Sequence, residues 1–172
     1  AISFREAARR AGVSHQAPYH LFGNREGILA ALAEEGFVGL NHVLEQKTVA
    51  DPIESLREMG RAYVSFALTY PAHYELMFHP RWRALDHVPG LQTAEQATRG
   101  RIEVAVQNLR ESGIALDQDP AEIVTLIWST LHGAVTLAQA GPLSRSSDPG
   151  TQQRIAEGAV NALTDLVIQA YT

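Results

Sequence analysis

The sequence predicts an all-α fold, and three observations support that prediction. Apolar residues recur at helical spacing through most of the 172 residues. Residues that begin helices, mainly Ser, Asn and Asp-Pro pairs, alternate with the Gly and Pro residues that end them. No segment of useful length shows the strict apolar and polar alternation that marks a strand. The chain is therefore expected to consist of helices joined by short connections.

The start of the chain predicts two short helices joined by a tight turn. Ser3 and Glu6 form a capping-box pattern, in which a helix begins directly after Ser3 and the Glu6 carboxylate bonds back to the cap. Gly12 suits the position after a helix end, and Ser14 offers an N-cap for a second helix over residues 15–22. This layout is that of a helix-turn-helix, whose second helix presents its first residues to the major groove of DNA.

Clear helix starts and stops divide the rest of the chain. Asn24 can cap a third helix over residues 25–46. Three Asp-Pro pairs follow, and each is typical of an N-cap and the first helical residue. The helices expected after residue 46 are 52–70, 72–78, 91–111, 120–140 and 151–170.

Helices 120–140 and 151–170 carry more apolar surface than a helix with one buried face needs. Their apolar residues spread around more than half of the circumference, and both contain several small residues. We expect the two helices to form a four-helix interface with the same pair of a second subunit. Burial of both helices within one chain is the alternative.

The N-terminal segment resembles the DNA-binding segment of TetR-type transcriptional regulators. The spacing A-x-x-x-G-V-S-x-x-x-x-Y-x-x-F-x-x-[KR] is typical of that family, and it is met here by Ala8, Gly12, Val13, Ser14, Tyr19, Phe22 and Arg25. The segment from Trp128 to Gly133 also resembles the W-x-x-x-H-G signature of one C-terminal subfamily. Family members carry one more helix ahead of this segment, so a truncated N-terminus is expected.

The resemblance implies a ligand-responsive regulator, by default a repressor. Such a protein forms a homodimer through its last two long helices and binds palindromic operator DNA. A small apolar or amphipathic effector releases the protein from the DNA. The expected domains are 1–46, the helix-turn-helix domain with its connecting helix, and 47–172, the helical effector-binding and dimerisation domain.

Charge and position predict the DNA contacts. The net charge is −5, yet the first 25 residues hold four arginines against one glutamate, as expected if one surface alone meets phosphates. The candidates for base edges, at the start of the second helix, are His15, Gln16 and Ala17. The candidates for phosphate contacts are Ser3, Tyr19, His20 and Arg25. Hydrophobic packing is the alternative for Tyr19, and simple solvent exposure is the alternative for His15 and His20.

Aromatic side chains concentrate in the middle of the chain. The resemblance implies a small-molecule pocket among these helices, and rings with polar tips suit its walls. The candidate pocket residues are Tyr63, Phe66, Tyr70, Tyr74, Phe78, Trp82, Trp128 and His132. Ordinary core packing is the alternative for each of them, and for His132 that means a satisfied core histidine beside Trp128.

Other function classes fit the sequence poorly. His73 and His79 lie on opposite sides of a continuous helix, and no metalloprotease, nucleophile-elbow or phosphate-loop motif is present. The absence of cysteine excludes disulfides and thiolate metal sites. The sequence contains no run of about eighteen apolar residues, so no membrane span is predicted. We expect a cytoplasmic protein without a cofactor, and the alternatives are a helical sensor or adaptor without DNA binding and a histidine-based metal enzyme.

Overall fold

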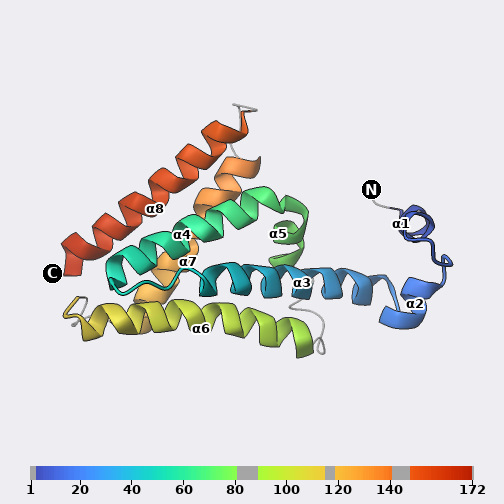
Figure 1. Cartoon of the computed structure of the whole chain (residues 1–172), viewed down its shortest axis with the longest axis horizontal. Helices are drawn as coiled ribbons and strands as arrows, with labels where there is room; N and C mark the ends of the chain where they lie inside the picture. The colour runs from blue at the N-terminus through green and yellow to red at the C-terminus, as the bar shows by residue number, and fades with distance from the viewer. Residues whose placement is uncertain (1–2, 81–88, 115–118, 141–147, 172) are drawn as a thin grey trace.

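The computed structural model describes residues 3–80, 89–114, 119–140 and 148–171. These residues form eight helices and no strand, so the all-α prediction is confirmed. The helices are α1 Phe4–Arg10, α2 Ala17–Phe22, α3 Arg25–Glu45, α4 Pro52–Thr69, α5 Pro71–Met77, α6 Pro89–Glu111, α7 Pro120–Ala140 and α8 Pro149–Tyr171. In Figure 1, the N-terminal unit (α1, α2 and their turn) stands at one end, and α3 joins it to a body formed with α4 to α8.

Most helix boundaries follow from the predicted caps. Asn24 Oδ1 accepts a hydrogen bond of 2.8 Å from a backbone N–H at the start of α3. Asp51 Oδ1 accepts from two backbone N–H groups at the start of α4. Gly12 and Gly113 take positive φ after α1 and α6, a conformation that glycine adopts at little cost. Several starts differ from the prediction by one or two residues, as helix ends commonly do.

The second helix begins later than predicted and lacks the predicted cap. Its N-cap residue is Gln16, which makes no side-chain hydrogen bond to the helix. Ser14 forms a turn instead, in which its backbone oxygen accepts from the Ala17 N–H at 3.1 Å. The later start places Pro18 second in the helix, where its missing N–H would be unpaired in any case. The position of the proline, and not the serine cap, therefore sets this boundary.

The body is built around one hydrophobic core. α3 packs against α5 and α6, α4 packs against α8, and α7 contacts α4, α6 and α8. The largest fully buried side chains come from α3, α4, α6, α7 and α8, and they include Phe37, Tyr63, Leu109, Ile127 and Val160. Because α3 contributes its later turns to this core, it ties the N-terminal unit rigidly to the body.

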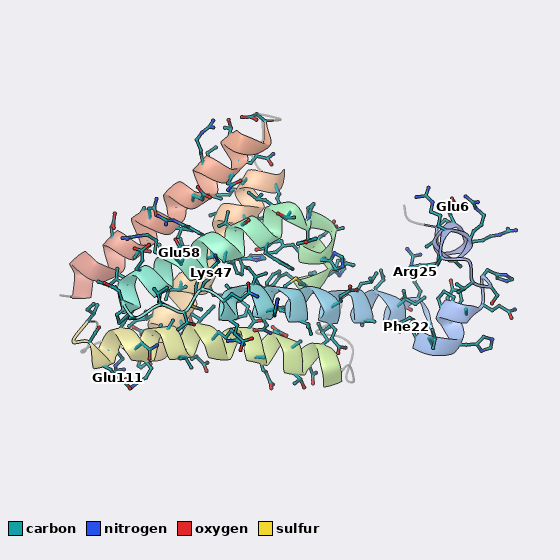
Figure 2. All side chains as sticks on the ribbon, viewed as in Figure 1. Glu6, Phe22, Arg25, Lys47, Glu58 and Glu111 are labelled. Carbon is teal, nitrogen blue, oxygen red and sulfur yellow. The ribbon has the colours of Figure 1, made fainter. Side chains whose placement is uncertain are left out.

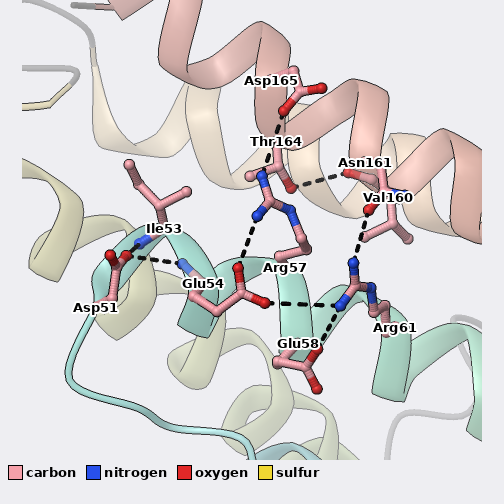
Figure 3. Close-up of polar contacts among 10 residues, drawn as sticks. All are labelled: Asp51, Ile53, Glu54, Arg57, Glu58, Arg61, Val160, Asn161, Thr164 and Asp165. Atoms are coloured by element: carbon pink, nitrogen blue, oxygen red, sulfur yellow. Dashed lines mark hydrogen bonds and ion pairs between the residues drawn. The ribbon is translucent and has the colours of Figure 1, made fainter.

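α4 and α8 approach each other closely at a glycine. A Cβ built on Gly60 would lie 2.7 Å from Val160 Cγ1, so no larger residue fits there without displacement. Beside this contact, Arg57 donates to Glu54 of its own helix at 2.7 Å and to Asp165 of α8 at 3.4 Å (Figure 3). Glu54, which stands at a capping-box position in the sequence, is thus part of a network that joins the two helices.

α7 is long and apolar enough to cross a membrane, judged by length and composition alone. In the structure, its apolar side chains Ile123, Ile127 and Val135 are buried among the neighbouring helices of the body. A core helix with a second face of small and apolar residues has the same composition. Packing within the body therefore accounts for part of the hydropathy of α7, and the rest belongs to apolar positions such as Leu137 that are exposed.

Candidate DNA-binding and effector sites

The N-terminal unit leaves most of its side chains exposed. α2 has no fully buried residue, and the only one in α1 is Ala8. His15 and Gln16 are exposed, but they lie in the turn before α2 and not in its first turn, where we expected them. Ala17 is half-buried and opens the helix. The base-reading candidates thus form an exposed corner at the N-terminal end of α2.

The phosphate candidates surround this corner. Tyr19 is 42% exposed, and His20 next to it on α2 is also exposed. The exposed Arg25 lies at the start of α3 with its guanidinium 5.6 Å from the centroid of the Phe4 ring (Figure 2), a cation–π contact that joins α3 to α1. The Ser3 hydroxyl caps α1 by accepting a hydrogen bond of 3.4 Å from the Glu6 N–H. Ser3 itself is exposed at the N-terminus of this helix.

Glu6 neutralises part of the positive charge of the unit. Its carboxylate accepts hydrogen bonds of 2.7 and 2.8 Å from Arg9 and of 3.0 Å from Arg10. The expected bond back to the cap is replaced by these pairs because residues three and four positions apart share a helix face. Hydrogen bonds from both arginines lower the pKa of the Glu6 carboxyl, and the bond to Glu6 raises the pKa of Arg9.

An apolar cavity of about 620 Å³ lies between the N-terminal unit and the body. Phe4, Ala8 and Phe22 line it from the unit, and Leu32 of α3 and Leu76 of α5 line it from the body. α1 packs on α2, and α2 packs on the first turns of α3. The position of the unit is therefore set chiefly by α3.

The aromatic candidates of the body form a connected group between α4, α5 and α7. The hydroxyl oxygens of Tyr63 and Tyr74 lie 3.0 Å apart, and that of Tyr74 lies 2.7 Å from His132 Nδ1. The Phe78 ring centroid is 4.5 Å from that of His132 and 6.3 Å from that of Trp128. Five of the eight predicted pocket residues are thus brought together.

A cavity of about 340 Å³, here called the His132 cavity, opens beside this group. Phe78, Trp128 and His132 line it, while Tyr63 and Tyr74 lie behind His132 in the core. Its remaining lining residues, which were not predicted from the sequence, are Arg99, Val124, Thr125 and Ser129. They carry no motif, and they belong to the cavity only because α6 packs against α7.

Three predicted pocket residues are placed differently. Phe66 is buried in the core and Tyr70 is 51% exposed, with their ring centroids 5.1 Å apart and neither ring lining the His132 cavity. Trp82 lies outside the described residues. Tyr63, Phe66 and Tyr70 share one face of α4 by spacing, but they are spread over about two turns. Tyr70 is the C-cap residue, with non-helical φ of −121° and ψ of 57°, so it lies beyond the end of the helix.

Burial keeps the polar tips of the group neutral. Burial raises the pKa of the Tyr63 and Tyr74 hydroxyls well above their usual range, and the hydrogen-bonded neighbour raises that of Tyr74 further. Burial also lowers the pKa of His132. All three groups are therefore uncharged near neutral pH.

α5 connects this group to α3. A Cβ built on Gly36 of α3 would lie 2.8 Å from both Cγ and Sδ of Met77 on α5, and 3.3 Å from His73 Cβ. The Phe78 ring, just after α5, packs edge-on against Phe37 with centroids 5.5 Å apart. A displacement of α5 would therefore act directly on the helix that carries the N-terminal unit.

The comparison with known families decides the identity of the fold. Residues 56–163 match the family described as tetracyclin repressor-like, C-terminal domain, which is more than half of the chain. The chain belongs to the TetR family of transcriptional regulators. Together with the all-helical fold, this match confirms the family resemblance and the assignment as a helical DNA-binding regulator.

Several solved structures share this arrangement. A protein of unknown function from Rhodococcus sp. RHA1 has a TM-score of 0.80 at 29% identity, over 99% of this chain and 84% of its own. The TetR-family regulator PfmR from Thermus thermophilus has a TM-score of 0.73 at 23% identity, over 98% and 88%. A TetR-family regulator from Pectobacterium atrosepticum has a TM-score of 0.70 at 22% identity, over 94% and 80%. A search of curated proteins found no match.

The TetR family is non-enzymatic, which argues against the metal-enzyme alternative. His73 Nε2 lies 3.9 Å from Glu35 Oε2. Within the ranges that the structure describes, no three His, Asp or Glu side chains gather to hold a metal ion. The family assignment and the geometry therefore point to regulation.

Proposed function

We propose that this TetR-family regulator is a cytoplasmic repressor that binds operator DNA as a homodimer and is released when a small effector fills the His132 cavity. Residues 1–46 would provide the DNA-binding domain, and residues 47–172 the effector-binding and dimerisation domain. The observation that carries the proposal is the single helix α3, which bears the exposed basic unit at its N-terminal end and packs through its middle turns on α5 beside the cavity.

The exposed corner before α2 supports base reading. Gln16 can form a bidentate pair with adenine, Ala17 can meet a thymine methyl group, and His15 extends the same surface. Tyr19, His20 and Arg25 flank this corner, and Ser3 lies at the N-terminus of α1, so phosphate contacts on either side would fix its register.

Exposed apolar stripes on α7 and α8 support the dimer. Leu137 is 46% and Leu166 is 53% exposed, although both are large and apolar. Cβ atoms built on Gly133 and Gly158 would meet nothing within 4 Å, so a partner helix has room to approach. The other apolar positions of the stripe on α8, at helical spacing from Leu166, are Ile155, Ala159 and Ala162. A symmetric pair of such faces would place two N-terminal units on successive major grooves.

The dimer is tested by a charge on this face. Leu166→Glu should shift the protein from dimer to monomer in sedimentation velocity and weaken operator binding, because a carboxylate would be buried without a partner. The matched control is Val104→Glu on α6, whose side chain is 60% exposed and borders the first turns of α7, in a hollow that includes neither Leu137 nor Leu166. A Leu166→Glu protein that remains dimeric would disprove this interface.

The DNA proposal is tested by selecting bound sequences from random duplexes. Tyr19→Phe and Arg25→Ala should weaken binding to all selected duplexes, and Arg25→Ala should reduce the salt dependence by about one phosphate contact. Gln16→Ala should change the preferred bases instead. Arg154→Ala, an exposed arginine on α8, is the control and should leave affinity unchanged.

The outcomes of this selection separate the alternatives. A Gln16→Ala profile identical to that of the parent protein would contradict base reading by Gln16. Enrichment of no duplex, or binding without salt dependence, would favour the helical sensor or adaptor without DNA binding, because phosphate contacts release counterions.

A further inference from the structure

The hydrogen-bond chain from Tyr63 through Tyr74 to His132 has a defined direction. Both hydroxyls are buried, with Tyr63 2% and Tyr74 3% exposed. In the part of the chain that the structure describes, the Tyr63 hydroxyl has Tyr74 as its one hydrogen-bond partner. Tyr74 stands in the middle and meets both Tyr63 and His132 Nδ1. The chain thus has two contacts, Tyr63–Tyr74 and Tyr74–His132. Three protons are available to them: one on each tyrosine hydroxyl and one on the neutral His132 ring.

One arrangement alone gives every buried hydroxyl proton an acceptor. Tyr63 donates to Tyr74, and Tyr74 donates to His132 Nδ1, which must then carry no proton. In the reverse order, Nδ1–H donates to Tyr74, Tyr74 donates to Tyr63, and the Tyr63 proton is buried with no acceptor. Buried unpaired donors are strongly disfavoured. The neutral ring therefore carries its proton on Nε2.

The other polar groups of the cavity offer both acceptors and donors, because a hydroxyl that has donated its proton to its own helix keeps an oxygen that can accept. The Thr125 hydroxyl donates to the Ala121 carbonyl at 2.7 Å, and the Ser129 hydroxyl donates to the Thr125 carbonyl at 2.7 Å. Their protons are thus used within α7. His132 Nε2, the Trp128 indole N–H and the guanidinium of Arg99 are donors, and Arg99 also bonds Glu103 at 2.9 Å.

We infer that the His132 cavity selects a flat apolar carbonyl compound, a carboxylic acid or amide, whose oxygen accepts a hydrogen bond from His132 Nε2–H. The rings of Phe78 and Trp128 supply the apolar wall, and the volume of about 340 Å³ suits one or two fused rings. A cationic amine is disfavoured by the positive charge of the Arg99 guanidinium, and its acceptors in the cavity are limited to the Thr125 and Ser129 hydroxyl oxygens. This inference names the effector class and rests on the proposed effector role of the cavity.

The tautomer is tested directly by NMR without any ligand. Two-bond ¹H–¹⁵N spectra of histidine-labelled protein distinguish protonated from unprotonated ring nitrogens, and His132 is assigned among the seven histidines by its loss in His132→Gln. We expect Nε2 protonated and Nδ1 unprotonated at pH 7.5. A protonated Nδ1 would overturn the inference.

The ligand class is tested with matched probes. 2-Naphthoate, 2-naphthamide and 2-naphthylmethylamine are titrated into the dimer by calorimetry, followed by related pairs of acids, amides and amines with one or two rings. The acids and amides should bind and the amines should not. Equal or tighter binding of the amines, or no binding of any acid or amide, would overturn the inference.

Variants then locate the contact. His132→Met removes the donor and should weaken amide binding by roughly two- to tenfold and carboxylate binding by roughly ten- to 150-fold, the ranges expected for one neutral and one charged hydrogen bond. His132→Gln keeps an N–H near the position of Nε2 and should restore most of the affinity. The matched control is His42→Met, an exposed histidine of α3 that contacts Gln46 of its own helix and does not line the cavity. These titrations contain no DNA, so a failure of operator binding would leave their result intact.

Discussion

Gly36→Ala would place a methyl group in the contact between α3 and α5. The added Cβ would lie 2.8 Å from two atoms of Met77 and 3.3 Å from His73 Cβ. The Met77 side chain is flexible but buried, and the His73 Cβ moves only with the α5 backbone, so relief requires Met77 to repack or α5 to move. Overpacking of this kind costs about 1–3 kcal/mol, whereas Gly→Ala inside a helix contributes about 1 kcal/mol. We expect a net loss of roughly 0–2 kcal/mol.

The control for this substitution is Gly100→Ala in α6. A Cβ at Gly100 would meet nothing within 4 Å, so the helix propensity acts alone and should stabilise the protein by roughly 0.5–1 kcal/mol. Urea unfolding followed by circular dichroism, at one protein concentration, measures both free energies. Gly36→Ala should also reduce effector-dependent release of DNA. Equal stabilisation by the two substitutions would refute the close contact between α3 and α5.

Three further predictions concern stability. Asp51→Ala should lower the free energy of unfolding by about 1 kcal/mol, measured in urea, because it removes the N-cap of α4. Tyr74→Phe should cost more than Tyr63→Phe in the same assay, since only the former leaves both a buried hydroxyl and His132 Nδ1 without a partner. Burial lowers the pKa of His132, so the unfolded chain binds more protons than the folded chain below about pH 6.5, and the free energy of unfolding should fall as the pH drops. This pH dependence should be absent in His132→Gln, as measured by urea unfolding from about pH 5 to pH 8.

Local signals predicted the helices well because most of the caps act over three or four residues. Asn24 and Asp51 cap the helices that they were expected to cap. The errors arose where two local signals competed. Ser14 is a residue type that commonly caps helices, whereas Pro18 fits best within the first turn of a helix. The helix begins at Ala17, which satisfies the proline and leaves Ser14 outside the cap position. Glu6 likewise had two partners within reach and bonds arginines in place of the cap.

The candidate sites were less predictable because they depend on contacts between helices. Residue type and family spacing selected Tyr74, Phe78 and His132, which do come together. The same reasoning also selected Tyr70, which is exposed because the helix ends at that residue. Arg99 was missed because its place beside the cavity follows from how α6 packs against α7, and neither helix carries a local signal for that packing.

The two faces of α5 explain why so short a helix matters for signalling. Its seven residues are too few for a stable isolated helix, so its position depends on its packing partners. Tyr74 and the following Phe78 face the His132 group, whereas His73 and Met77 face Gly36 on α3. We expect a ligand that displaces Phe78 to shift α5, because Phe78 directly follows this helix and Met77 and His73 of α5 pack closely against Gly36 of α3. α3 would receive that shift and carry it to the N-terminal unit.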